Sequence, residues 1–214
     1  MTSVRVSAVF RRRILAMAVL LLLPLALGAG SAAAATTSPT GARKFLDDYT
    51  KLGLTTFNDK SLDAAAKKQK IRGMIGDGFD IETIARFVLS RHYRSLSDTQ
   101  RAEYHQLYFD YVLSTYFKRL IDFGKLNLML IDTTSAQDGD ALVNTKADRP
   151  DGPPLRLQWR VRANDAGSFK IVDIIAEGVS IAVTQRSDFN AVMSSKGYPG
   201  LVDALKQKIR DAEK

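Results

Sequence analysis

The chain has 214 residues, of which 45% are hydrophobic and 25% are charged, with a formal net charge of +8 and no cysteine. The lack of cysteine excludes disulfide bonds and lipid attachment at a cysteine side chain. Acidic residues are interleaved with the basic ones, which argues against the concentrated basic face of a nucleic-acid-binding protein. We therefore expect no nucleic-acid partner, and instead contact with anionic lipid headgroups or acidic protein surfaces.

The first 35 residues are predicted to be a cleavable signal peptide. Residues 5–13 carry four arginines and no acidic residue, residues 14–27 are apolar, and residues 33–35 are alanines that suit signal peptidase. The apolar stretch is shorter than the ~20 residues that span a bilayer and contains Pro24, so an uncleaved membrane anchor is the less favoured alternative. Cleavage near Ala35 would leave a single domain, residues 36–214, and would lower the charge from +8 to +4 because the four arginines are removed.

Residues 40–123 are predicted to form helices. Residues 40–54 show helical periodicity, and a second helical segment follows Ser61 but fades at the glycines of residues 73–78, which we interpret as a hinge or break. Asp80 is a candidate cap for a short helix that ends at Leu89. Ser97 and Gln100 match a capping box that opens the longest helix, which runs to about residue 123.

Apolar side chains cover most of the circumference of this long helix, whereas a helix on the outside of a globular protein needs only one apolar stripe. The apolar residues are Tyr104, Leu107, Tyr108, Phe109, Tyr111, Val112, Leu113, Tyr116, Phe117, Leu120, Ile121 and Phe123. Either the helix is central and surrounded by other elements, or it has the core on one side and an apolar ligand on the other.

Beyond Gly124 the apolar residues recur at every second position, which indicates strands. We predict a four-stranded antiparallel sheet within residues 125–176, with strands at about 125–133, 141–147, 155–162 and 169–176. Apolar side chains of the third strand share one face: Leu155, Leu157, Trp159 and Val161. One dry face and one wet face are typical of an antiparallel sheet.

Two helices are predicted after the sheet, at about 181–195 and 199–213, with Gly197 as the stop between them. Helices first, four antiparallel strands next and helices last define an α+β fold.

Enzyme chemistry finds little support in the sequence, and we expect no catalytic residue, metal or cofactor. The chain has two histidines, which do not provide the paired spacing of a zinc site, and His92 is expected at the surface. Residues 178–182 approach the nucleophile pattern of hydrolases around Ser180, but no histidine follows in the chain, so we favour a helix cap for Ser180. Asp77, Asp80 and Glu82 lack the order of a calcium loop.

The chain resembles the MlaC family, the periplasmic phospholipid carriers of Gram-negative bacteria that are also called toluene-tolerance auxiliary components. The likeness covers residues 40–208. It rests on the order and separation of several short segments: residues 79–80, 85–89, 96–97, 100–101, the aromatic and aliphatic residues of 104–120, 169–173, 177–181, 186–189 and 197–205. Ser90 and Tyr93 stand where the family commonly has glycine and tryptophan. The family also contains proteins associated with hopanoid production.

The resemblance implies a twisted antiparallel sheet packed against helices around a deep apolar cavity. Such a cavity takes the acyl chains of a lipid while the headgroup stays near solvent. The resemblance also implies a periplasmic carrier that moves phospholipid between an outer-membrane lipoprotein complex and an inner-membrane ABC transporter with a lipid-binding ring. The long helix and the dry face of the sheet would then be two walls of one pocket.

On this basis a set of apolar residues is predicted to contact lipid: Phe87, Leu107, Tyr111, Tyr116, Leu126, Leu128, Leu157, Trp159, Val161, Val172, Ile174 and Val179. Arg91 and Arg94 are predicted near the headgroup, with a solvated surface position as the alternative. Periodicity does not separate cavity walls from an ordinary core. The competing interpretations are a secreted interaction module with a filled core and no lipid ligand, and a lipid hydrolase that uses Ser180.

Overall fold

The computed structural model describes residues 36–123, 128–136, 138–148, 152–164 and 166–212, with side chains described for all of these except residues 117–123. The predicted signal peptide and Leu126 therefore lie outside the described residues. In chain order the elements are α1 (Pro39–Asn58), α2 (Ala64–Gly78), α3 (Ile81–Leu89), the 3-10 helix η1 (Ser90–Ser95), α4 (Asp98–Phe123), β1 (Leu128–Ser135), β2 (Ala141–Ala147), β3 (Leu155–Ala163), β4 (Phe169–Ala176), β5 (Val179–Ser180) and α5 (Ile181–Ala212).

The predicted α+β class is confirmed, with one correction to the sheet. The strands follow one another in the order β1-β2-β3-β4-β5, and each pair is antiparallel. The sheet has five strands rather than four, because the chain turns back at Glu177 and Gly178, both at positive φ, and pairs Val179 and Ser180 with the end of β4. A strand of two residues is too short to show alternation.

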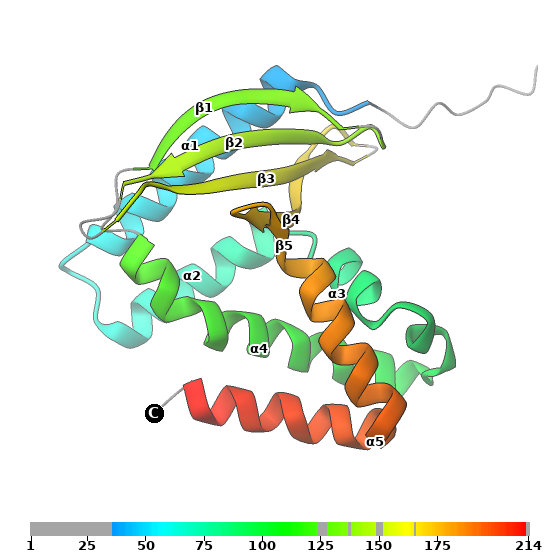
Figure 1. Ribbon diagram of the computed structural model, residues 1–214. Helices are drawn as coiled ribbons and strands as arrows, with labels where there is room; N and C mark the ends of the chain where they lie inside the picture. The colour runs from blue at the N-terminus through cyan, green and yellow to red at the C-terminus, as the bar shows by residue number, and fades with distance from the viewer. Residues whose placement is uncertain (1–35, 124–127, 137, 149–151, 165, 213–214) are drawn as a thin grey trace, which may run out of the picture. The chain divides into compact units, whose positions relative to one another are not determined.

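Helix α1 packs against the dry face of the sheet. Ala42 and Leu46 of α1 are fully buried against Val143 of β2 and Val161 of β3. Figure 1 shows α1 lying across the strands, with α2 and α4 on a second level beyond the edge of the sheet. Within the described residues, no helix combines the length and the hydropathy needed to cross a membrane.

The predicted helix starts at Asp80 and Ser97 are confirmed by their hydrogen bonds. The Asp80 carboxylate accepts from the Thr83 amide at 3.0 Å. The Ser97 hydroxyl accepts from the Gln100 amide at 3.2 Å, and the Gln100 side chain accepts from the Ser97 amide at 3.0 Å, which completes the capping box. These interactions satisfy backbone groups that a helix terminus leaves without an intrahelical partner.

The predicted break within residues 73–78 is wrong for Gly73 and Gly76 and holds only at Gly78. Helix α2 continues through Gly73 and ends only at Gly78. Ile71 and Ile75 of α2 are buried against Leu113 of α4, and this packing outweighs the backbone entropy that glycine loses in a helix. The predicted stop at Gly197 is confirmed, since this residue has φ 65° and separates the two limbs of α5 seen in Figure 1.

Two glycines of α2 offer a matched test of this packing. A Cβ at Gly78 would collide with the ring of Tyr49, whereas no described atom lies within 4 Å of a Cβ at Gly73. Gly78→Ala should therefore destabilise the protein by about 1–3 kcal/mol through overpacking. Gly73→Ala should stabilise it by about 0.5–1 kcal/mol because alanine loses less backbone entropy. Thermal melts of the two variants should shift in opposite directions, and a loss of stability in both would mean that α2 bends at Gly73.

Candidate ligand cavity

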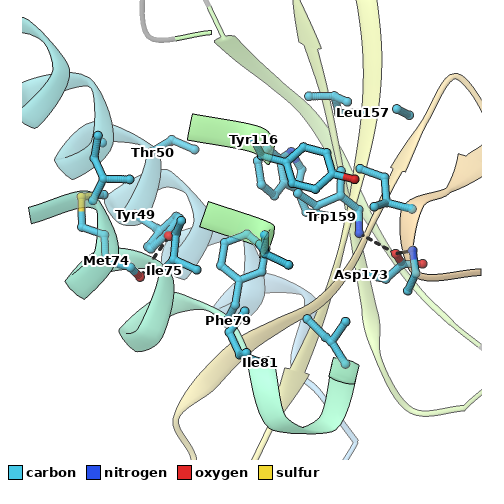
Figure 2. Close-up of a pocket in the computed structure, with 18 of the residues that line it drawn as sticks. Tyr49, Thr50, Met74, Ile75, Phe79, Ile81, Tyr116, Leu157, Trp159 and Asp173 are labelled. Carbon is cyan, nitrogen blue, oxygen red and sulfur yellow. Dashed lines mark hydrogen bonds between the residues drawn. The ribbon is translucent and has the colours of Figure 1, made fainter. Parts of the chain in front are cut away.

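A cavity of about 440 Å³ lies between the sheet and the helices. Its wall is built from α1, α2, α3, α4, β1, β3, β4 and α5 together with the segment that joins α2 to α3. The apolar residues that line it are Leu54, Phe57, Ile71, Met74, Ile75, Phe79, Ile81, Ile84, Val112, Leu128, Leu155, Leu157, Trp159, Ile174, Ala176, Ile181 and Ala182. Figure 2 shows Met74, Ile75 and Phe79 on the helical side of this space and Leu157 and Trp159 on the strand side.

Polar atoms on the α1 and β3 parts of the wall are paired within the protein. The Tyr49 hydroxyl donates to the Met74 carbonyl at 3.1 Å, and the Thr50 hydroxyl donates to the Leu46 carbonyl at 2.8 Å. The Trp159 indole N–H donates to the Thr145 hydroxyl at 2.9 Å. Because these groups are satisfied, their side chains present carbon to the cavity, which makes the wall suitable for a hydrocarbon.

Three side chains form a hydrogen-bonded group on the α4–α5 side of the cavity. The Tyr108 hydroxyl donates to Gln185 Oε1 at 2.6 Å, and Gln185 Nε2 donates to the Tyr116 hydroxyl at 3.2 Å. Tyr108 and Gln185 are both buried, and all three residues line the cavity. This group is called the α4–α5 polar group below.

Burial raises the pKa of the Tyr108 phenol well above its ordinary value, with smaller contributions from neighbouring tyrosines and Asp173. Burial likewise raises the pKa of Tyr49, and the charge of Asp77 adds to the effect. Both phenols are therefore neutral over the whole physiological range, so they act as hydrogen-bond donors and bring no charge to the cavity.

Asp173 lines the cavity, but structural hydrogen bonds occupy its carboxylate. It accepts from the Ile174 amide at 2.8 Å, the Ala182 amide at 3.1 Å and the Ser180 hydroxyl at 2.6 Å. The Ser180 hydroxyl in turn accepts from the Val183 amide at 3.0 Å, so the predicted role of Ser180 as a helix cap is confirmed. Asp173 and Ser180 together fix the start of α5 against the end of the sheet.

The position of the long helix α4 corresponds to the second of the two alternatives left open by its sequence, with the cavity where that alternative has an apolar ligand. Tyr104, Leu107 and Tyr111 pack with α3 and α5 in a filled core. Tyr108, Val112 and Tyr116 line the cavity. The helix therefore has core on one flank and the cavity on another, which explains why its apolar surface is so wide.

Five of the residues predicted to contact lipid lie in the cavity wall: Tyr116, Leu128, Leu157, Trp159 and Ile174. Six others lie outside this wall: Phe87, Leu107, Tyr111, Val161, Val172 and Val179. Leu126 lies outside the described residues. The cavity thus lies against the first half of β3 and the last half of β4, and not against the end of β3 that carries Val161.

The positions of the six residues outside the cavity wall are explained by their local surroundings. Val161 shares a face with Trp159, but α1 covers that end of β3 and leaves Val161 with 0% exposure in a filled core. Phe87 is 41% exposed on α3, where the Arg186 guanidinium lies 5.0 Å from its ring centroid. Val179 is 61% exposed in β5. Leu107 and Tyr111 belong to the core of α3, α4 and α5, and Val172 is buried in β4.

The two arginines predicted near a headgroup lie on η1, outside the cavity wall. Arg91 is exposed and donates to the Asn190 side chain at 3.3 Å. Arg94 is also exposed, and its backbone carbonyl accepts from Arg101 at 3.4 Å. His92, expected at the surface, is partly buried and lies 3.1 Å from the Asn190 side-chain oxygen.

Sequence reasoning missed the contribution of α1 and α2 to the wall. Tyr49, Phe57, Met74 and Ile75 line the cavity, although the sequence indicates only helical periodicity for residues 40–54 and a hinge or break for residues 73–78. It also missed Gln185, for which a signal existed. Gln185 lies four residues after Ile181 and four before Phe189, which places it on the apolar side of α5.

The fold and the cavity define an α+β protein with an apolar cavity between its sheet and its helices. No group of three or more histidine, aspartate or glutamate side chains suited to a metal ion occurs among the described residues. The sequence profile described as MlaC protein matches residues 49–207, and the chain therefore belongs to the MlaC family, as its motifs indicated.

A solved structure with the same fold is described as the phospholipid-binding protein from Ralstonia solanacearum in complex with a phospholipid. The two chains superpose with a TM-score of 0.70 at 20% sequence identity, over 81% of this chain and 99% of the other. At this level of identity the likeness establishes the shared fold.

A pair of substitutions locates the cavity along the sheet. Ile174 lies directly opposite Trp159 in the sheet and lines the cavity, so Ile174→Trp should extend into open space and change the melting temperature little. Val161→Trp should be destabilising by about 1–3 kcal/mol or more, because the site between β3 and α1 is already filled. Thermal melts followed by circular dichroism compare the two, and equal destabilisation would mean that the space beside Ile174 is not open.

Proposed function

We propose that this protein is a periplasmic carrier that binds the acyl chains of a phospholipid or related lipid in the cavity. The observation that carries the proposal is a space of about 440 Å³ with an almost wholly apolar wall. This volume lies within the roughly 300–1,000 Å³ that is usual for small-molecule sites. It corresponds to about fifteen water molecules at the density of liquid water, far more than the voids of an ordinary core.

Acyl chains need such a wall during transfer through water. Each methylene exposed to water costs about 0.8 kcal/mol, so a chain of ~15 carbons costs on the order of 12 kcal/mol without shelter. A cavity that shields the chain from solvent removes most of this barrier. On the α1 and β3 parts of the wall, the polar atoms of Tyr49, Thr50 and Trp159 are already paired and leave no side-chain donor of these residues unsatisfied beside the hydrocarbon.

Family membership and the neighbouring structure support the same proposal. The chain belongs to the MlaC family, resemblance to which implies a phospholipid carrier, and the Ralstonia protein of similar fold is described as phospholipid-binding and was solved in complex with a phospholipid. We extend this to the partners of the present chain, which we propose are an outer-membrane lipoprotein complex and an inner-membrane ABC transporter with a lipid-binding ring. The basic and apolar leader of residues 1–35 supports export to the periplasm.

The alternatives are less well supported. An interaction module with a filled core does not account for an apolar cavity of this volume. A hydrolase would need an activated Ser180, but that hydroxyl donates to Asp173 and accepts from the backbone of α5. A role for Arg91 and Arg94 at the headgroup rests on the sequence prediction alone.

The single tryptophan of the chain provides a direct test of where the lipid lies. Trp159 is in the cavity wall, so a phospholipid with dibrominated acyl chains should quench its fluorescence at short range. The same lipid without bromine should not. Quenching is measured by titration of the purified protein with each lipid.

A matched control moves the tryptophan out of the cavity. In a Trp159→Phe/Phe87→Trp variant the indole would lie on the exposed side of α3, and brominated chains should leave its fluorescence unchanged. Equal quenching in both proteins would place the lipid on the surface and contradict the proposal.

Removal of the bound lipid should lower stability. Protein purified from the periplasm of its native host should release lipid on organic extraction, detected by mass spectrometry. A ligand at 100 times its Kd adds about 2.7 kcal/mol to the folded state, so the delipidated protein should melt several degrees lower. Re-addition of the extracted lipid should restore the melting temperature. Protein that carries no lipid and melts unchanged after extraction would favour the interaction module.

A further inference from the structure

Among the described residues that line the cavity, one side-chain donor stands apart from the other polar groups. Tyr49, Thr50 and Trp159 donate to protein oxygens, and three protein donors occupy the carboxylate of Asp173. This donor is the side-chain amide of Gln185, which is 5% exposed and lines the cavity.

The side-chain amide of Gln185 has two N–H donors, and the protein uses only one of them. Tyr108 bonds one end of the amide at 2.6 Å, and Tyr116 bonds the other at 3.2 Å. The nitrogen of the amide lies at one end and is hydrogen-bonded to one tyrosine oxygen, whichever of the two ends it occupies. Its two N–H groups therefore have one tyrosine oxygen between them. One N–H of Gln185 therefore has no partner among the described residues. Because the two tyrosines hold the amide from both ends, its orientation is fixed before any ligand arrives.

We infer that Gln185 donates this N–H to the ester carbonyl oxygen of the bound lipid and thereby selects acyl esters. The inference rests on the proposed function of the cavity. Within a lipid tail, the ester carbonyl is the oxygen directly attached to the hydrocarbon, so it reaches the wall together with the chain. A buried donor left without a partner is costly, and a ligand oxygen at this point removes that cost.

The charges around Gln185 favour a neutral oxygen over a phosphate or a carboxylate. No lysine, arginine or histidine occurs among the described residues that line the cavity. The carboxylate of Asp173 lies in the same wall and would repel an anion strongly where water is scarce. A neutral ester carbonyl accepts a hydrogen bond without this repulsion.

Ether lipids provide the test, since they have the same chains and headgroup but lack the carbonyl oxygen. Diester and diether phosphatidylcholines of equal chain length are used to displace the brominated phospholipid, with recovery of Trp159 fluorescence as the readout. The wild-type protein should bind the diester roughly fivefold more tightly than the diether, the effect expected of one neutral hydrogen bond.

Two variants assign this preference to Gln185. Gln185→Met keeps the length of the side chain but removes the amide, so the ratio of ester to ether affinity should fall to about one. Gln106→Met on the exposed side of α4 should keep the wild-type ratio, since Gln106 bonds Asp110 outside the cavity. If loss of the amide destabilises the fold by removing its hydrogen bonds to Tyr108 and Tyr116, the Tyr108→Phe/Tyr116→Phe/Gln185→Met variant makes all three side chains apolar and tests the same ratio.

The outcomes separate the two levels of the proposal. Equal affinity of the wild-type protein for the two lipids, or an unchanged preference in the Gln185→Met variant, would overturn the role of Gln185 and leave the carrier function intact. If neither lipid displaces the brominated probe and the probe itself does not quench Trp159, the proposed lipid binding fails.

Discussion

The structure depends on keeping an apolar space open beside a densely packed core. Large aromatic side chains line this space, and an untethered ring would swing inward to gain contacts, since protein interiors favour dense packing. The hydrogen bonds of Tyr49 to Met74 and of Trp159 to Thr145 tie two of these rings to neighbouring elements, the first from α1 to α2 and the second from β3 to β2. The same bonds that satisfy the polar atoms therefore also restrain two of the rings that line the cavity.

Features set by local interactions could be predicted from the sequence, and those set by packing between elements could not. The cap at Asp80 and the capping box at Ser97 were predictable because their partners lie within three residues. The continuity of α2 through Gly73 was not, because it depends on the burial of Ile71 and Ile75 against α4. Strand β5 could not be predicted because two residues are too few to show the alternation of a strand.

The residues of the candidate site show the same difference between what local pattern predicts and what packing decides. Alternation in β3 predicts that Trp159 and Val161 share a face, and they do. It does not predict what lies opposite each residue, and α1 fills the space above Val161 while the cavity lies beside Trp159. Whether a residue of a strand lies in the core or in the cavity wall depends on which element covers it. Because alternation does not show this, the sequence places residues of one face together in the lipid site, although the structure divides them between core and cavity.

A carrier has to release its ligand as well as hold it, and this limits how the wall can be specific. Burial of hydrocarbon is non-directional, so an apolar sleeve by itself lets a chain slide to any depth. A single neutral hydrogen bond adds only about 1 kcal/mol to the binding free energy. Sheltering a chain of ~15 carbons from water contributes on the order of 12 kcal/mol, which is far more. Placed at Gln185, such a hydrogen bond would fix the depth of the chain while raising affinity only about fivefold. One oriented amide in an otherwise apolar wall thus reconciles a defined binding position with release to the next partner.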